Sequence, residues 1–264
     1  MVAFVAATSA VLGLAVGSFL NVVIHRVPRK ESVVRPRSRC PGCGTELANR
    51  DNIPVVSWLL LRGRCRTCGE PISGRYPAVE VTTAVVFAAV GAAVADRDGG
   101  DHLAVVPAFL VLAAVLVAVS FIDIEHFLVP NRVLIAGTYV AAPLLVLGAA
   151  ATDGGWSRLG RSALAVAVAG GALLVLNLVS PRGMGMGDVK LAAFEGAFLG
   201  WLGWGELALG LFLGFLLGSV GGLTLIALRL RSRKDHIPFA PFLAAGALLA
   251  VTLGEPLLEI YSGG

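Results

Sequence analysis

The chain has 264 residues, of which 56% are hydrophobic and only 14% are charged. A soluble domain carries roughly 25% charged residues, so this chain has too few of them to cover a globular surface in water. The composition argues against a soluble enzyme, and the same apolar excess excludes an intrinsically disordered chain. The formal net charge of +4 raises nucleic acid or an anionic membrane as a partner, and the distribution of the basic residues decides between them.

Apolar runs long enough to span a bilayer, which takes about 17–25 residues in a helix, recur along the chain. They cover residues 2–24, 78–95, 103–122, 133–151, 162–179, 205–228 and 238–260. A shorter apolar stretch at 191–204 is either an eighth span or a re-entrant segment. The first run has no basic segment before it and no small-residue cleavage pattern after it, so we expect a membrane anchor and not a signal peptide. The sequence predicts an all-α polytopic membrane protein with about eight transmembrane helices.

Basic residues concentrate between the first and second runs, where residues 26–75 hold eleven of the 21 Lys and Arg. The positive-inside rule places this loop in the cytoplasm. With eight spans the other loops alternate, and eighteen basic residues then lie inside, while Arg97, Arg158 and Arg161 lie outside. A re-entrant 191–204 segment would put the basic 229–237 loop outside, so eight spans with both termini outside is the preferred topology. This pattern indicates the lipid bilayer as a partner and sets nucleic acid aside.

All four cysteines lie in this first loop, in two CxxC pairs separated by 21 residues. They are Cys40, Cys43, Cys65 and Cys68. This spacing is typical of a zinc ribbon, in which four thiolates close a tetrahedron around the metal. Gly44 and Gly69 follow the two pairs and can turn the backbone under the metal. Two disulfides or redox pairs are the alternatives, and a reducing cytoplasm disfavours them. Because four protein ligands leave no open position, we expect a structural zinc ion.

The predicted organisation therefore has three parts. Residues 1–25 form the first transmembrane helix, residues 26–77 form a small cytoplasmic zinc-binding loop, and residues 78–264 form a membrane domain with seven further helices.

Two aspartates lie at predicted helix boundaries on the same side of the membrane: Asp123 in FIDIEHFLVPN and Asp188 in GMGMGDVKL. Charged residues beside membrane spans are costly and are therefore candidates for function. Two carboxyl groups brought together can share one proton, so that one activates a water molecule while its protonated partner polarises a peptide carbonyl. This is the chemistry of an aspartic protease. From the residues alone, helix capping or simple exposure to water explains the two aspartates equally well.

Taken together, these motifs make the sequence resemble the prepilin leader peptidase and N-methyltransferase family, the GxGD-type membrane aspartic peptidases of type IV pilus, type II secretion and competence systems. The resembling segments are GSFLNVVIHRVP at 17–28, RSRCPGC at 37–43, NIPVVSWLLLRGRCRTCGEPISGRYPAVE at 52–80, FID at 121–123, GMGDVKLAA at 185–193 and IPFAPFLAAGA at 237–247. The resemblance implies a bacterial inner-membrane enzyme that cleaves the leader of prepilins or pseudopilins at the cytoplasmic face, after a glycine. It further implies N-methylation of the new amino terminus with S-adenosylmethionine.

The resemblance also implies roles for individual residues. Asp123 and Asp188 match the family's two catalytic aspartates, and Lys190 in the same GDVK motif would orient or neutralise near Asp188. The four cysteines match the zinc ligands of the bifunctional members, in which this loop is linked to methylation. Glu80, at the head of the second span, either meets the new ammonium group of the substrate or is a helix N-terminal acid stabilised by the macrodipole. No motif marks the binding site of S-adenosylmethionine.

Two residues depart from the family pattern. Asn131 follows Pro130 where the family often has an aspartate, so we do not expect this position to be catalytic. Glu195 lies in the short apolar stretch, where an apolar residue is usual, and we place it outside the expected catalytic pair. Two other hypotheses stay open: a peptidase without methylation, and a transporter or scaffold whose zinc ribbon docks a cytoplasmic partner. The latter leaves the two aspartates unexplained.

Overall fold

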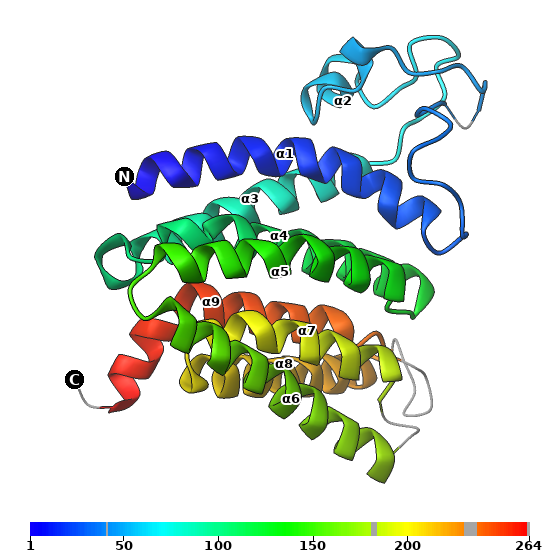
Figure 1. Cartoon of the computed structure of the whole chain (residues 1–264). Coiled ribbons are helices and arrows are strands. Elements are labelled where there is room, and N and C mark those ends of the chain that lie inside the picture. The colour runs from blue at the N-terminus through cyan, green and yellow to red at the C-terminus, as the bar shows by residue number, and fades with distance from the viewer. Residues whose placement is uncertain (41, 181–183, 230–236, 263–264) are drawn as a thin grey trace.

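The computed structural model describes residues 1–40, 42–180, 184–229 and 237–262, and these residues are mainly helical (Figure 1). The long helices are α1 (Val2–Arg26), α3 (Arg75–Asp96), α4 (Val106–His126), α5 (Asn131–Ala151), α6 (Gly155–Val179), α7 (Met186–Leu202), α8 (Trp204–Ala227) and α9 (Ala240–Ser262). Short elements are α2 (Val56–Leu60) and the 3-10 turns η1 (Asn49–Asp51), η2 (Arg97–Gly100) and η3 (Leu103–Val105). The described residues form no β-sheet, only two isolated bridges.

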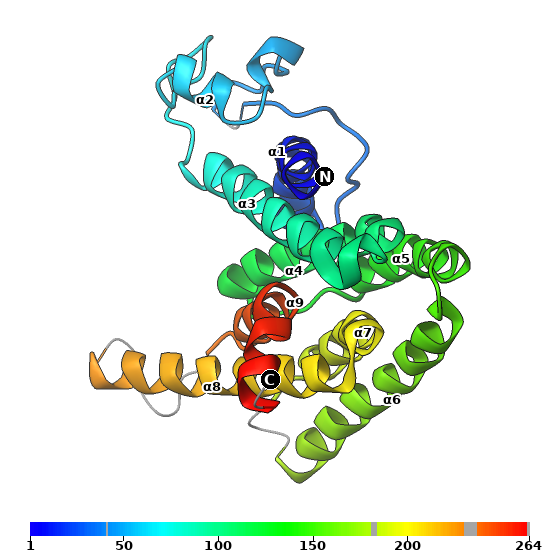
Figure 2. The ribbon, with the colours of Figure 1, turned by 90° about the vertical axis from the view of Figure 1, so that its left-hand side faces the viewer.

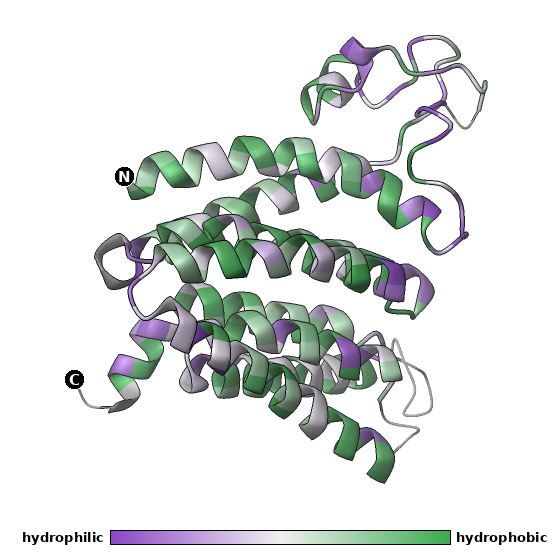
Figure 3. Cartoon of the chain, in the orientation of Figure 1, coloured by the Kyte–Doolittle hydropathy of each residue, from purple (hydrophilic) through white to green (hydrophobic). Residues whose placement is uncertain are grey.

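Seven helices within the described ranges are long and apolar enough to cross a membrane: α1, α3, α4 (with η3), α5, α6, α8 and α9. Figure 3 shows that these helices consist mainly of hydrophobic residues, and that many of the hydrophilic residues lie in the cysteine loop and near helix ends. The predicted all-α membrane fold is confirmed. The stretch at 191–204 belongs largely to α7, one continuous helix of 17 residues, which packs against α6, α8 and α9. Most of the predicted basic loop at 229–237 lies outside the described residues.

Small residues let α1 and α3 approach closely. A Cβ atom added to Gly13 would lie 2.7 Å from the Cα atom of Ala84, and one added to Gly17 would lie 2.7 Å from the Cα atom of Glu80. Small residues four positions apart form such a stripe on one helix face, and stripes of this kind are a common interface between membrane helices. The GSFLN motif therefore holds α1 against the beginning of α3.

Small residues also allow a close approach in two further helix pairs, α6 with α7 and α8 with α9. The close approaches involve Gly196 and Gly200 of α7 with Ala165 and Ala169 of α6, and Gly210 and Gly214 of α8 with Leu243, Gly246 and Ala247 of α9. Figure 2 shows that several of these helices cross obliquely. Helix α4 lies at the centre of the bundle, where most of its apolar residues are buried.

A buried ion pair joins three helices at the end of α3. The Arg97 guanidinium group lies 2.8 Å from the Glu206 carboxylate of α8, and both side chains are about nine-tenths buried. Arg97 also donates a hydrogen bond to the carbonyl oxygen of Val251 on α9. Nearby, Arg161 donates hydrogen bonds to the last carbonyl groups of α7, where a cation is favoured by the helix dipole.

Candidate active site and metal centre

Asp123 lies in the last turn of α4, which ends at Phe127. Phe127 adopts a left-handed conformation (φ 52°), and its N–H group donates to the carbonyl oxygen of Asp123. The Asp123 side chain is buried at 6% exposure, and its Oδ2 atom accepts the N–H group of Ala240 at 3.1 Å. Ala240 is the first residue of α9, and a helix N-terminus favours a carboxylate. The structure thus places Asp123 where the end of one helix meets the beginning of another.

Asp188 lies in the first turn of α7. Its Oδ2 atom accepts the N–H group of Gly185 at 3.0 Å, and the side chain is buried at 8% exposure. The neighbouring Gly187 approaches Val129, so closely that a Cβ atom at residue 187 would lie 2.8 Å from the Val129 Cβ atom. A larger residue in this GxGD motif would therefore push α7 away from the segment that follows α4.

The packing of α4 against α7 brings the two aspartates to the same end of the bundle. Phe109, near the beginning of α4, stacks edge-on against Phe198, near the end of α7, with ring centroids 5.5 Å apart. From this contact α4 continues for about 21 Å to Asp123, and α7 extends back for about 15 Å to Asp188, at 1.5 Å per residue. Both carboxyl groups are buried at this end of the bundle. A buried pair of this kind can hold a single proton between its members.

Lys190 bonds to a residue that departs from the family pattern. Its Nζ atom donates to the Oδ1 atom of Asn131, the first residue of α5, at 3.0 Å. The bond joins α7 to α5 two residues from Asp188, so it holds the beginning of α7 in place. An orienting role of Lys190 toward Asp188 stays a prediction.

Glu80 lies near the beginning of α3 and is buried at 7% exposure. Its Oε2 atom accepts the N–H group of Val55 at 2.7 Å, so the carboxylate joins α3 to the cysteine loop. Arg75, at the start of the same helix, forms an ion pair with Glu125 at the end of α4. The beginning of α3 is therefore at the same end of the bundle as Asp123.

Glu195 is the residue near this site that sequence reasoning set aside. It is 1% exposed and lies seven residues, or about two turns, beyond Asp188 on the same face of α7. Its Oε1 atom has no hydrogen-bond partner among the described residues. A helical side chain covers the turn N-terminal to its own Cα atom, so Glu195 leans toward Asp188. The spacing of seven residues between Asp188 and Glu195, which is two helical turns, is the feature of the sequence that indicates this neighbourhood.

The four cysteines form one cluster in the loop. All four Sγ atoms lie within 4.8 Å of one another, and those of Cys40 and Cys68 are 3.7 Å apart. Four sulfurs at the usual zinc distance of about 2.3 Å stand about 3.8 Å from each other, whereas a disulfide requires about 2.05 Å. The cluster therefore fits a tetrahedral metal ion, and the cysteines are free of disulfides. The structure therefore favours the metal site over the alternative of two disulfides.

Two matching turns build this cluster. Gly44 and Gly69 have positive φ angles (70° and 72°), and each donates its N–H group to the carbonyl oxygen of the first cysteine of its pair. Hydrogen bonds from the side chain and backbone of Thr45 lower the pKa of Cys43 to about 6. Backbone N–H groups of Cys68 and Thr67 lower the pKa of Cys65. At these two cysteines the thiolate, the form that binds metal, is thereby favoured, whereas burial and the neighbouring thiols raise the pKa of Cys68 to about 12.

Comparison with known proteins assigns both parts of the chain. Residues 11–94 match the bacterial peptidase A24 N-terminal domain, and residues 110–226 match the type IV leader peptidase family. An Aeromonas hydrophila protein is 37% identical over 280 residues, covering 94% of this chain and 90% of the relative. A Bacillus subtilis protein is 34% identical (95% of each chain), and one from Pseudomonas aeruginosa is 36% identical (95% of this chain, 91% of the relative). All three are named prepilin leader peptidase/N-methyltransferase. No solved structure matches significantly.

Proposed function

The chain belongs to the type IV leader peptidase family, and we propose that Asp123 and Asp188 are the two carboxyl groups with which it cleaves prepilins. It is a bifunctional membrane enzyme, a prepilin peptidase and N-methyltransferase. The observation that carries the assignment of the residues is the position of two buried aspartates at one end of the bundle, each with one oxygen held by a backbone N–H group.

The chemistry follows from a pair that holds one proton. The ionised aspartate takes a proton from water as the water oxygen bonds to the scissile carbonyl carbon, and the protonated partner gives its proton to the carbonyl oxygen. When the C–N bond breaks, the leaving amine takes one proton and the pair regains its own. Backbone N–H groups of Ala240 and Gly185 keep one oxygen of each carboxyl group in place, so the other oxygen is the one that faces water and substrate.

The cleavage takes place at the cytoplasmic face of a bacterial inner membrane, after a glycine. The eleven basic residues of the 26–75 loop support this orientation through the positive-inside rule. The loop, the end of α4 with Asp123 and the beginning of α7 with Asp188 lie at the same end of the bundle (Figure 1), which supports their sharing one side of the membrane. Prepilins and pseudopilins are the substrates.

Methylation of the new amino terminus follows cleavage, and S-adenosylmethionine supplies the methyl group. Glu80 holds the substrate's ammonium group near the loop, a role supported by its burial and by its hydrogen bond from Val55. Zinc occupies the thiol cluster as a structural ion: Cys40, Cys43, Cys65 and Cys68 bind it and leave no position for substrate. Lys190, through its bond to Asn131, positions the beginning of α7 and with it Asp188.

Co-expression with a prepilin, followed by mass spectrometry of its amino terminus, separates the two activities. We expect Asp188→Asn to leave the leader uncleaved, and Glu80→Gln to give a cleaved amino terminus with less methylation. Asp101→Asn, on an exposed side chain, is the matched control and retains both. Full cleavage by Asp188→Asn would refute the aspartic mechanism, and full methylation by Glu80→Gln would refute the role of Glu80.

A further inference from the structure

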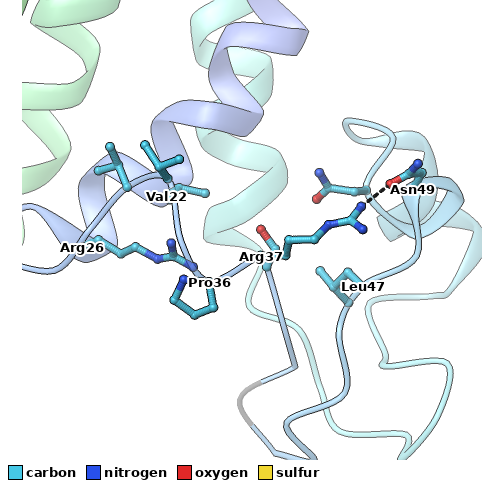
Figure 4. Close-up of a pocket in the computed structure, with 10 residues that line it drawn as sticks. Val22, Arg26, Pro36, Arg37, Leu47 and Asn49 are labelled. Atoms are coloured by element: carbon cyan, nitrogen blue, oxygen red, sulfur yellow. Dashed lines mark hydrogen bonds between the residues drawn. The ribbon is translucent and has the colours of Figure 1, made fainter.

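A pocket lies between the end of α1 and the cysteine loop (Figure 4). Its lining consists of Val22 and Arg26 of α1 and, from the loop, Val33, Val34, Pro36, Arg37, Ser38, Leu47, Asn49 and Asn52. It belongs neither to the aspartate pair nor to the thiol cluster. Val22 and Arg26 lie in the last two turns of a membrane span. The pocket is therefore at the level where that span leaves the bilayer.

The lining is basic. It contains the guanidinium groups of Arg26 and Arg37 and no carboxylate. Arg26 donates one hydrogen bond to the carbonyl oxygen of Ser32, and Arg37 donates one to the Oδ1 atom of Asn49 at 2.6 Å. A guanidinium group has five N–H donors, so both arginines keep several for a ligand. The whole loop has eleven Lys and Arg against four Asp and Glu, so its field favours an anion.

The volume of the pocket and the apolar residues of its lining limit which anions can bind. The pocket encloses about 210 Å³, whereas sites for drug-sized ligands enclose roughly 300–1,000 Å³. The volume suits a phosphate headgroup, and Val22, Val33 and Leu47 offer apolar surface beside the two arginines. S-adenosylmethionine is a larger molecule, and its sulfonium and ammonium groups give it a net positive charge. Both properties disfavour it in this pocket.

We propose that this pocket binds the phosphate group of an anionic phospholipid and thereby fixes the cysteine loop on the end of α1. Arg37 belongs to the loop and Arg26 to the membrane helix, so a lipid headgroup in contact with both would bridge the two parts. Asn49 orients Arg37 through the hydrogen bond seen in Figure 4. The bilayer supplies this anion next to the pocket, at a local concentration that no soluble phosphate reaches.

Native mass spectrometry of the full-length protein, titrated with phosphatidylglycerol or phosphatidylcholine, tests the proposal. We expect phosphatidylglycerol to bind preferentially, and Arg37→Gln to weaken this binding at least about tenfold, since hydrogen bonds between charged groups are the strong ones. Arg26→Gln should do the same. Arg64→Gln is the matched control, because it removes one charge from an exposed position of the same loop outside the pocket. If Arg26→Gln fails to fold, Arg26→Lys replaces it: this variant keeps the positive charge but loses the planar guanidinium group, so it should also bind phosphatidylglycerol more weakly than the wild type.

Each other outcome overturns the proposal. Equal weakening by Arg37→Gln and Arg64→Gln would mean that diffuse loop charge attracts the lipid and that the pocket is no site. Displacement of phosphatidylglycerol by inorganic phosphate at equal concentration would identify a soluble anion as the ligand. Displacement by S-adenosylmethionine would make this the methyl-donor site. Equal binding of the two lipids would exclude recognition of the anionic headgroup.

Discussion

The buried pair of Arg97 and Glu206 offers a quantitative test of the packing. Arg97→Gln removes the cation and leaves the Glu206 carboxylate buried without its partner at 2.8 Å. Removing one partner of a buried ion pair costs about 3–5 kcal/mol. For a chain of this size a loss of 1 kcal/mol lowers the melting temperature by about 2–4 °C, so we expect a decrease of about 6–20 °C. Because Arg97 lies at the far end of α3 from Glu80, cleavage by the folded fraction should be unchanged.

Thermal unfolding of the purified protein in detergent, followed by tryptophan fluorescence, measures this. The double variant Arg97→Met with Glu206→Leu should recover most of the loss, since a hydrophobic replacement of similar volume is often neutral or stabilising. Arg39→Gln is the control: its pair with Glu46 spans 4.0 Å with both side chains about half exposed, and such pairs contribute about 0–1 kcal/mol. A single variant as stable as the control, or a double variant as unstable as the single one, would refute this reasoning.

Three further predictions concern the metal centre, the α1–α3 contact and Glu195. Cys65→Ser should abolish a content of about one zinc per chain measured by metal analysis. Because zinc binds thiolates and its binding releases protons, the wild type should keep zinc at neutral pH and release it on acidification. Gly17→Val should lower stability by about 1–3 kcal/mol through overpacking against the Glu80 backbone. Glu195→Leu should raise the melting temperature, since a buried unpaired polar atom costs about 1–3 kcal/mol.

Each of these has a result that would contradict it. A fully structured loop without metal would remove the structural role of zinc. A Gly17→Val protein with wild-type stability would mean that α1 and α3 can separate freely. A strong loss of stability in Glu195→Leu would mean that the carboxyl group has a hydrogen-bond partner, such as a buried water molecule.

The sequence predicts contacts between distant residues correctly where the residue types allow few arrangements. Two CxxC pairs with a glycine after each admit few folds other than a metal-binding turn, and the structure brings their sulfurs together as expected. Apolar runs of sufficient length likewise predict membrane helices, and the part of the chain that the structure describes contains seven. The two aspartates were placed on one side by counting spans, and the Phe109–Phe198 contact gives the same result from packing.

What the sequence did not predict depends on contacts between distant residues. The partner of Lys190 is Asn131, 59 positions away, and no local pattern indicates that bond. The pairing of Arg97 with Glu206 joins the end of α3 to the first turn of α8, and the sequence indicates for Arg97 only a side of the membrane. Glu195 was set aside because a lone acid in an apolar helix is ambiguous until its neighbours are known. The packing of one helix against another decides all three.

The most direct test of the central claim is the rate at which purified Asp123→Asn and Asp188→Asn variants cleave a prepilin. Both substitutions preserve the size of the side chain and its capacity to accept the N–H groups of Ala240 and Gly185, so both proteins should fold and melt close to the wild type. We predict that each variant loses cleavage by at least about a thousandfold, since neither can form a pair that holds one proton. Cleavage by either variant at a rate near the wild type would contradict the aspartic mechanism.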